Sequence, residues 1–138
     1  MRLLHAFLLV ISATSCMAQS PKINHLTDKL DCTAINTSPQ LDDCVHKQMM
    51  KSNTLLLNEF VNFEKLAKHV YAVDPKLGKE LIEKVRKAQD AWITFREQNC
   101  SVDAFEVEEG TPAYITTVNN CIIRMNAERI KELKMLLH

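Results

Sequence analysis

Three helix-start signals divide this chain and constrain its fold more than any other feature. Each combines a capping residue with a proline in the first helical turn: Thr37-Ser38-Pro39, Asp74-Pro75 and Thr111-Pro112. Proline is favoured there because the first N–H groups of a helix have no partner within the helix, so the lack of an N–H in proline costs no hydrogen bond. Gln40 stands three residues after Thr37 and can complete a capping box. The chain is therefore predicted to form three long helices.

Apolar residues recur at helical spacing after each start signal. They predict helices that run from 38 to about 73, from 75 to about 100 or slightly beyond, and from 112 to near the C-terminus. The expected inward-facing positions are Leu41, Val45, Leu55, Leu56, Phe63, Leu66, Ala67 and Val70 in the first helix, Leu77, Leu81, Val85, Ala88, Trp92 and Phe95 in the second, and Ile115, Val118, Cys121, Ile122, Met125 and Leu133 in the third. Gln48 and Ser52 interrupt the first stripe and predict looser packing there. With two glycines and no strand-like alternation, the expected fold is all-α, an antiparallel bundle of three long helices.

The first residues have the composition of an export signal. A short basic start is followed by an apolar stretch over 3–11, interrupted by His5, and by small residues up to Ala18. The apolar stretch is too short to span a bilayer. We expect a signal peptide over 1–18, a tether over 19–30 and a helical domain over 31–138, located in the periplasm or secreted.

A lipid anchor is the alternative to plain cleavage. The run Ala13-Thr14-Ser15-Cys16 loosely resembles a lipoprotein cleavage box, which would leave Cys16 as a lipidated N-terminus. The leucine that usually stands three residues before that cysteine is missing, so the sequence favours plain cleavage.

Four cysteines remain after the signal: Cys32, Cys44, Cys100 and Cys121. In an exported domain of about 120 residues, four cysteines indicate two disulfides with three possible connectivities. We favour the sequential pairing, Cys32–Cys44 and Cys100–Cys121, because each bridge then closes a short local loop. Zinc is disfavoured because no two cysteines are spaced C-x-x-C, and no metal site is expected.

The charges balance, with 17 basic and 17 acidic residues, which argues against a nucleic-acid partner. They are nevertheless unevenly distributed, because 97–123 contains no lysine or arginine. A cluster of acidic residues in this stretch, with a neighbouring hydroxyl, is the candidate partner-binding surface: Asp103, Glu106, Glu108, Glu109 and Thr111. Such a surface suits a basic partner. The alternative is a solvated loop without a partner.

Trp92 and Arg96 lie one turn apart on the second helix and are predicted to be structural. Trp92 is expected to anchor the core. Arg96 can reach a carboxylate on a neighbouring helix or a carbonyl at a helix end. Its planar fork could instead recognise a partner's carboxylate.

Catalytic motifs are missing from the sequence. There is no glycine-rich phosphate loop and no H-E-x-x-H, and His25, His46 and His69 stand singly. Glu108 and Glu109 are adjacent, but adjacency in a loop does not make an acid–base pair. The sequence therefore predicts a binding protein without a cofactor rather than an enzyme.

Three blocks of spaced residues link the chain to a known family. They are Asp31-Cys32-Thr33-Ala34 followed by Thr37 and Cys44, then Ala88-Gln89-x-Ala91-Trp92-x-x-Phe95-Arg96-x-x-x-Cys100, and last Gly110-Thr111 followed by Cys121 and Arg129 to Leu133. In these blocks the chain resembles the LprI-type lysozyme-inhibitor family of small exported bacterial proteins. Gln40 replaces the usual glutamate of the first block, and Glu109-Gly110 replaces the usual Gly-Gly of the third.

The resemblance implies a helical, disulfide-bonded exported domain and lysozyme as a candidate partner, bound non-covalently to protect the cell wall. Many lysozymes are basic with an acidic catalytic cleft, so an acidic loop could dock on the rim of the cleft. The alternative is an envelope interaction or stress module on the same scaffold with another partner, for which the region around Gln48 and Ser52 is a candidate groove.

Overall fold

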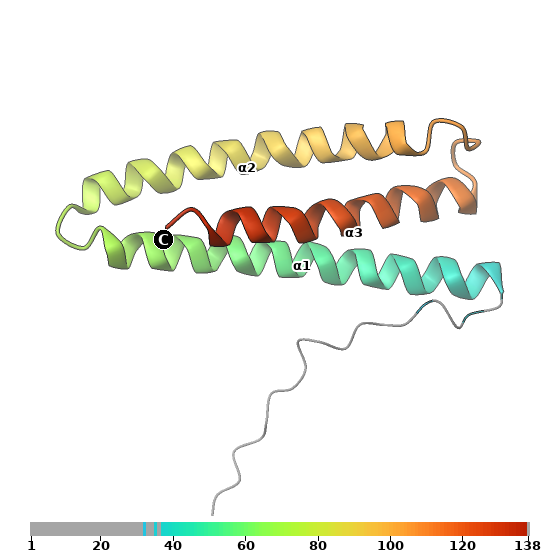
Figure 1. The fold of residues 1–138 in the computed structure, drawn as a ribbon, viewed down its shortest axis with the longest axis horizontal. Helices are drawn as coiled ribbons and strands as arrows, with labels where there is room; N and C mark the ends of the chain where they lie inside the picture. The colour runs from blue at the N-terminus through green and yellow to red at the C-terminus, as the bar shows by residue number, and fades with distance from the viewer. Residues whose placement is uncertain (1–31, 33–34, 36, 138) are drawn as a thin grey trace, which may run out of the picture.

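The computed structural model describes residues 32, 35 and 37–137 of the chain. The expected signal peptide (1–18), with Cys16, and the expected tether (19–30) lie outside these residues. Within them the fold consists of three helices, α1 (Ser38–Val70), α2 (Pro75–Asp103) and α3 (Pro112–Lys134). They form an antiparallel bundle whose two connections lie at opposite ends (Figure 1). This confirms the predicted all-α fold.

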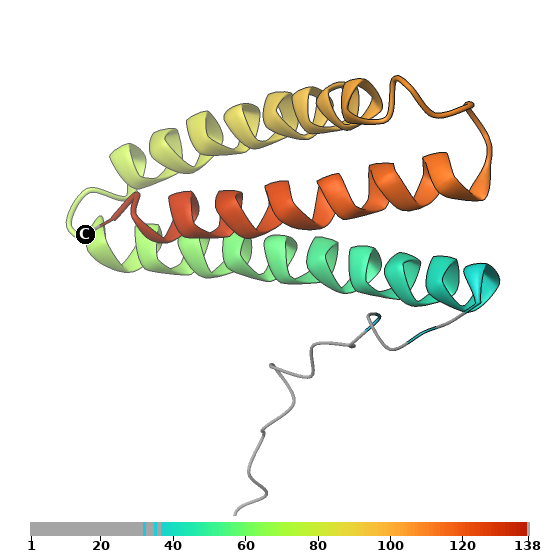
Figure 2. The ribbon, with the colours of Figure 1, turned by 45° about the vertical axis from the view of Figure 1, so that its right-hand side comes forward.

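The three helices do not pack equally. In both Figure 1 and Figure 2, α3 follows α1 along its length, and the contacts between these two helices are the most extensive in the bundle. The α1–α2 contact is the least extensive. The bundle is thus a tight α1–α3 pair with a more loosely attached α2.

Two of the three predicted caps form as expected. The Asp74 carboxylate accepts from the Leu77 amide at 3.1 Å, and the Thr111 hydroxyl accepts from the Tyr114 amide at 3.2 Å. At the start of α1, however, the Thr37 hydroxyl makes no bond to a helix amide and donates instead to the side chain of Gln40 at 2.8 Å. The two residues of the predicted capping box therefore bond to each other through their side chains, and the Thr37 side chain does not cap the helix.

The first connection is a tight turn. Helix α1 ends at Val70, three residues before the predicted end, and the next residues form a turn in which the Asp74 amide donates to the Tyr71 carbonyl at 3.0 Å. Gly78 lies against Tyr71, where a side-chain Cβ would come within 2.8 Å of the Tyr71 Cβ. Glycine allows this close approach, which lets α2 fold back directly on the end of α1.

The buried face of α2 is displaced by about one residue from the predicted one, since Leu81, Val85 and Trp92 are only half-buried. Leu77, Ala88 and Phe95 are exposed. The residues of α2 that are buried are Gly78, Ile82, Gln89, Arg96 and Cys100. The polar side chains of Gln89 and Arg96 therefore occupy the interior, and the apolar residues alone do not locate the centre of the buried face.

Both predicted disulfides are present. Cys32 is bonded to Cys44, and Cys100 to Cys121. The first ties the segment before α1 to the second turn of that helix, and the second ties the end of α2 to α3. The main apolar cluster, formed by Phe63, Ala67 and Ile82, lies at the other end of the bundle, near the first connection.

Candidate functional site

The connection between α2 and α3, residues 104–111, contains most of the predicted partner-binding residues and is named the acidic loop below. The Cys100–Cys121 disulfide joins the helices on its two sides, with a Cα–Cα distance of 5.5 Å. Ala104 is fully buried, and the Val107 amide donates to the Ala104 carbonyl at 2.9 Å. Gly110 has a φ of 79°, a conformation that glycine adopts without strain, and it directs the chain into α3. The loop is thus short, turned on itself and clamped at its base.

The carboxylates of this region differ in their partners. Asp103 forms an ion pair with Arg124 of α3 at 2.6 Å, so its charge is already partly compensated. Glu106, Glu108 and Glu109 are exposed, and among the described residues none of the three forms an ion pair. Three uncompensated negative charges therefore lie within four residues of one loop.

Thr111 has a structural role at the end of the loop. Its hydroxyl accepts from the Tyr114 amide and donates to the Glu108 carbonyl at 2.7 Å. The side chain thus fixes the start of α3 and the backbone that carries Glu108.

Further acidic residues lie at the same end of the bundle. The Thr116 hydroxyl of α3 donates to the Asp42 carboxylate of α1, which holds the N-terminal part of α3 against the start of α1. Asp43 is exposed and pairs with Lys47. The opposite end, around the first connection, contains the lysine-rich stretch 65–87. The molecule therefore has an acidic end and a basic end.

Two exposed apolar side chains beside the acidic loop were not predicted. Phe105 is 85% exposed and Val102 is 70% exposed. Both lie outside the apolar stripe of α2, and Phe105 follows directly after the helix end. An aromatic residue among acidic residues at a helix end was the available sequence signal. Large exposed aromatic side chains are frequent anchors of protein interfaces.

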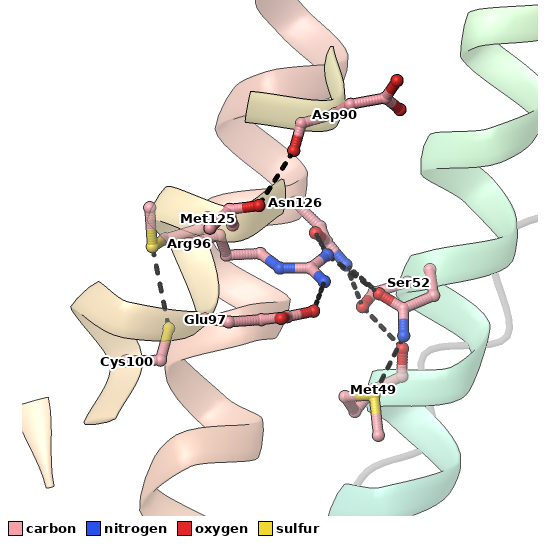
Figure 3. Close-up of polar contacts among 10 residues, drawn as sticks. Met49, Ser52, Asp90, Arg96, Glu97, Cys100, Met125 and Asn126 are labelled. Atoms are coloured by element: carbon pink, nitrogen blue, oxygen red, sulfur yellow. Dashed lines mark hydrogen bonds and ion pairs between the residues drawn. The ribbon is translucent and has the colours of Figure 1, made fainter. Parts of the chain in front are cut away.

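Arg96 lies inside the bundle with only 8% of its side chain exposed (Figure 3). Its Nη1 donates to the side-chain oxygen of Asn126 at 2.7 Å and to that of Asn53 at 3.1 Å. The expected partner, a carboxylate of a neighbouring helix or a carbonyl at a helix end, is replaced by two side-chain amides. The nearest carboxylate is Glu97 on the same helix, 3.5 Å from Nη2. Burial lowers the pKa of the Arg96 guanidinium, and Glu97 partly opposes this effect.

Asn126 connects this guanidinium to α1. It is completely buried, and its Nδ2 donates to the Ser52 hydroxyl at 2.8 Å and to the Asn53 oxygen at 2.9 Å. We name Ser52, Asn53, Arg96 and Asn126 the polar layer. Ser52, one of the two residues that interrupt the apolar stripe of α1, therefore belongs to a buried hydrogen-bonded layer.

Trp92 is half-buried beside the polar layer. Two guanidinium groups lie close to its ring, with the Arg96 and Arg129 Cζ atoms 5.5 and 5.7 Å from the ring centroid. Arg129 is held in place by Gln89, which accepts from its Nε at 2.9 Å. The half-buried indole therefore packs beside two cationic side chains and does not fill the centre of the core.

No group of three or more potential metal-ligating side chains comes together in the part of the chain that the structure describes. Within the same residues, no helix is long and apolar enough to cross a membrane.

The chain was compared with models of known protein families. The family model described as Lysozyme inhibitor LprI matches residues 31–133. The chain belongs to the LprI family. The matched region contains both disulfides, the acidic loop and the polar layer, and disulfides of this kind suit an oxidising compartment. Neither the curated proteins nor the solved structures gave a match to this member of the family.

Proposed function

We propose that this LprI-family protein inhibits a lysozyme outside the cytoplasm by non-covalent binding, with the acidic loop and Phe105 at the interface. The observation that carries the proposal is the disulfide-clamped acidic loop, which presents three uncompensated carboxylates beside an exposed aromatic ring. Membership of a family of lysozyme inhibitors supplies the class of partner.

The geometry suits binding to a basic protein. A loop that is ordered before binding loses little conformational entropy on association. Its carboxylates attract a basic surface and speed the encounter, whereas an apolar anchor that is buried on contact slows dissociation. We therefore assign Glu106, Glu108 and Glu109 to association and Phe105, with Val102 beside it, to retention of the complex.

The direct test is lysis of a cell-wall substrate by chicken-type lysozyme in the presence of the purified mature protein. We expect lysis to slow with increasing inhibitor and to stop near saturation. Undiminished lysis at a large molar excess would refute the proposal for that class of lysozyme.

Replacing Glu106, Glu108 and Glu109 by glutamine should lower the association rate with lysozyme about tenfold at low salt and flatten its salt dependence. Surface binding kinetics at several salt concentrations measure both effects. A control with the same change in net charge replaces Glu80 and Glu83 by glutamine and Asp90 by asparagine, all exposed on α2 away from the loop. Equal slowing by the two triple variants would assign the effect to net charge and remove the loop from the interface.

Phe105→Ala should raise the dissociation rate of the complex by about tenfold or more, because truncating an aromatic anchor typically costs over about 1–2 kcal/mol. Since the ring is 85% exposed in the free protein, the free energy of unfolding should change little. Val73→Ala, an exposed truncation in the first connection, is the control and should leave the dissociation rate unchanged. An unchanged rate for Phe105→Ala would exclude the ring as an anchor.

A further inference from the structure

A cavity of about 350 Å³ lies between α1 and α2, the two helices that contact each other least extensively. Its apolar walls are Leu56, Leu57 and Phe60 of α1 and Ile93 of α2. This volume falls within the range of about 300–1,000 Å³ that small-molecule sites occupy. The cavity is separate from the acidic loop, since it is bordered by the middle of both helices.

One end of the cavity is formed by Arg96 and Asn53 of the polar layer. Buried cations in proteins are ordinarily paired with an anion. Arg96 is buried, yet its short hydrogen bonds go to neutral amides, and its Nε has no hydrogen-bond partner among the described residues. The carboxylate of Glu97 stands at 3.5 Å and is itself mostly exposed to water. The guanidinium is therefore an incompletely compensated charge on the wall of an apolar cavity.

We infer that this cavity binds a small apolar carboxylate, with its carboxylate against Arg96 and its hydrocarbon part between Leu57, Phe60 and Ile93. A carboxylate would form charge-assisted hydrogen bonds with the guanidinium and supply the missing negative charge. The apolar part would cover side chains that now face water, of which Leu57 is 62% exposed.

The length and the far end of the cavity set the size of the ligand. Asn53 and Phe60 are seven residues apart on α1, which corresponds to about 10 Å along the helix, the length of a medium alkyl chain. At the far end Arg86 is occupied, since it pairs with Glu64 and lies over the Phe60 ring. The Asp90 carboxylate also borders the cavity, but it points away from Arg96 in Figure 3. The carboxylate of a ligand is thus directed to the Arg96 end.

Trp92 provides a reporter for this site. It is the only tryptophan of the chain, and its ring contacts the Arg96 guanidinium. Titration of the full mature protein with decanoate should give a saturable change in tryptophan fluorescence and a one-to-one calorimetric isotherm. Decanol, which has the same chain without the charge, should bind at least about tenfold more weakly, because the charged hydrogen bonds are lost. Equal affinity for the two probes, or no saturable binding of decanoate, would overturn the inference.

A pair of matched variants tests the location. Leu57→Asp places a negative charge at the cavity wall and should weaken decanoate binding by at least about tenfold. Met50→Asp lies two turns earlier on the same helix, at a residue of similar exposure, 54% against 62%, that does not border the cavity, and should bind decanoate normally. Normal binding by Leu57→Asp, or equal weakening in both variants, would contradict the assignment. Both variants should still inhibit lysozyme. A negative result in the decanoate test would therefore leave the proposed function standing, and a negative result in the lysis test would leave the decanoate site standing.

Discussion

Asn126→Leu is expected to lower the free energy of unfolding by about 3–5 kcal/mol, although leucine has a similarly branched side chain with the same number of non-hydrogen atoms. The asparagine is completely buried and accepts from Arg96 while it donates to Ser52 and Asn53. The leucine removes all three bonds and leaves the guanidinium charge with still fewer partners in the interior. Urea unfolding followed by far-ultraviolet circular dichroism measures the loss.

Two controls separate the effect of losing the buried hydrogen bonds from the general effect of replacing asparagine by leucine. Asn120→Leu makes the same change at an exposed position of α3 and should alter stability by less than about 0.5 kcal/mol. The double variant Arg96→Met with Asn126→Leu removes the buried charge together with its partner, and it should be more stable than Asn126→Leu alone. A double variant that is less stable than the single one by the full cost of Arg96→Met would show that the two residues are not coupled.

Replacing Cys100 and Cys121 by alanine is expected to lower the free energy of unfolding by about 3 kcal/mol, because the bridge closes a loop in the unfolded chain. The cysteines are 21 residues apart, and both are buried at the base of the acidic loop. Under the proposed function the same change should also weaken lysozyme inhibition, since the loop loses its clamp and must be ordered on binding. Urea unfolding and the lysis assay measure the two effects.

The other disulfide is the control for this double effect. Cys32 and Cys44 are 12 residues apart, and their bridge lies at the same end of the bundle but joins neither of the helices that flank the loop. Their replacement by alanine should also destabilise the protein. Inhibition at a temperature where both variants are folded should be impaired only in the variant that lacks Cys100–Cys121. Equal inhibition by the two variants would show that the clamp does not matter for binding.

The position of the acidic loop could be predicted because its signals are local. The carboxylates follow one another along the chain, and the Thr111-Pro112 signal fixes where the loop ends. The sequence could not predict which of the acidic residues are ion-paired and which are not. Asp103 forms an ion pair with Arg124, which is 21 residues away in sequence, whereas Glu106, Glu108 and Glu109 are exposed without an ion pair among the described residues.

The polar layer was missed for a different physical reason. A polar residue on an amphipathic helix is ordinarily assigned to the solvent side, so Arg96 and Asn126 are left out of any apolar pattern. Gln89 and Arg96 are seven residues apart, as are Asn119 and Asn126, and all four are buried. This two-turn spacing was visible in the sequence, but it does not reveal that Arg96 and Asn126 are hydrogen-bonded to each other inside the bundle.

The sequence by itself determined the three helices and favoured the observed pairing of the cysteines, because helix starts, turns and short disulfide loops depend on residues close together in the chain. Only the tertiary structure decided which face of α2 turns inward. That choice depends on partners from other helices, since Arg96 can be buried only where Asn53 and Asn126 accept its hydrogen bonds. The same partners leave its charge without a close, buried carboxylate beside the cavity between α1 and α2, which no local pattern could indicate.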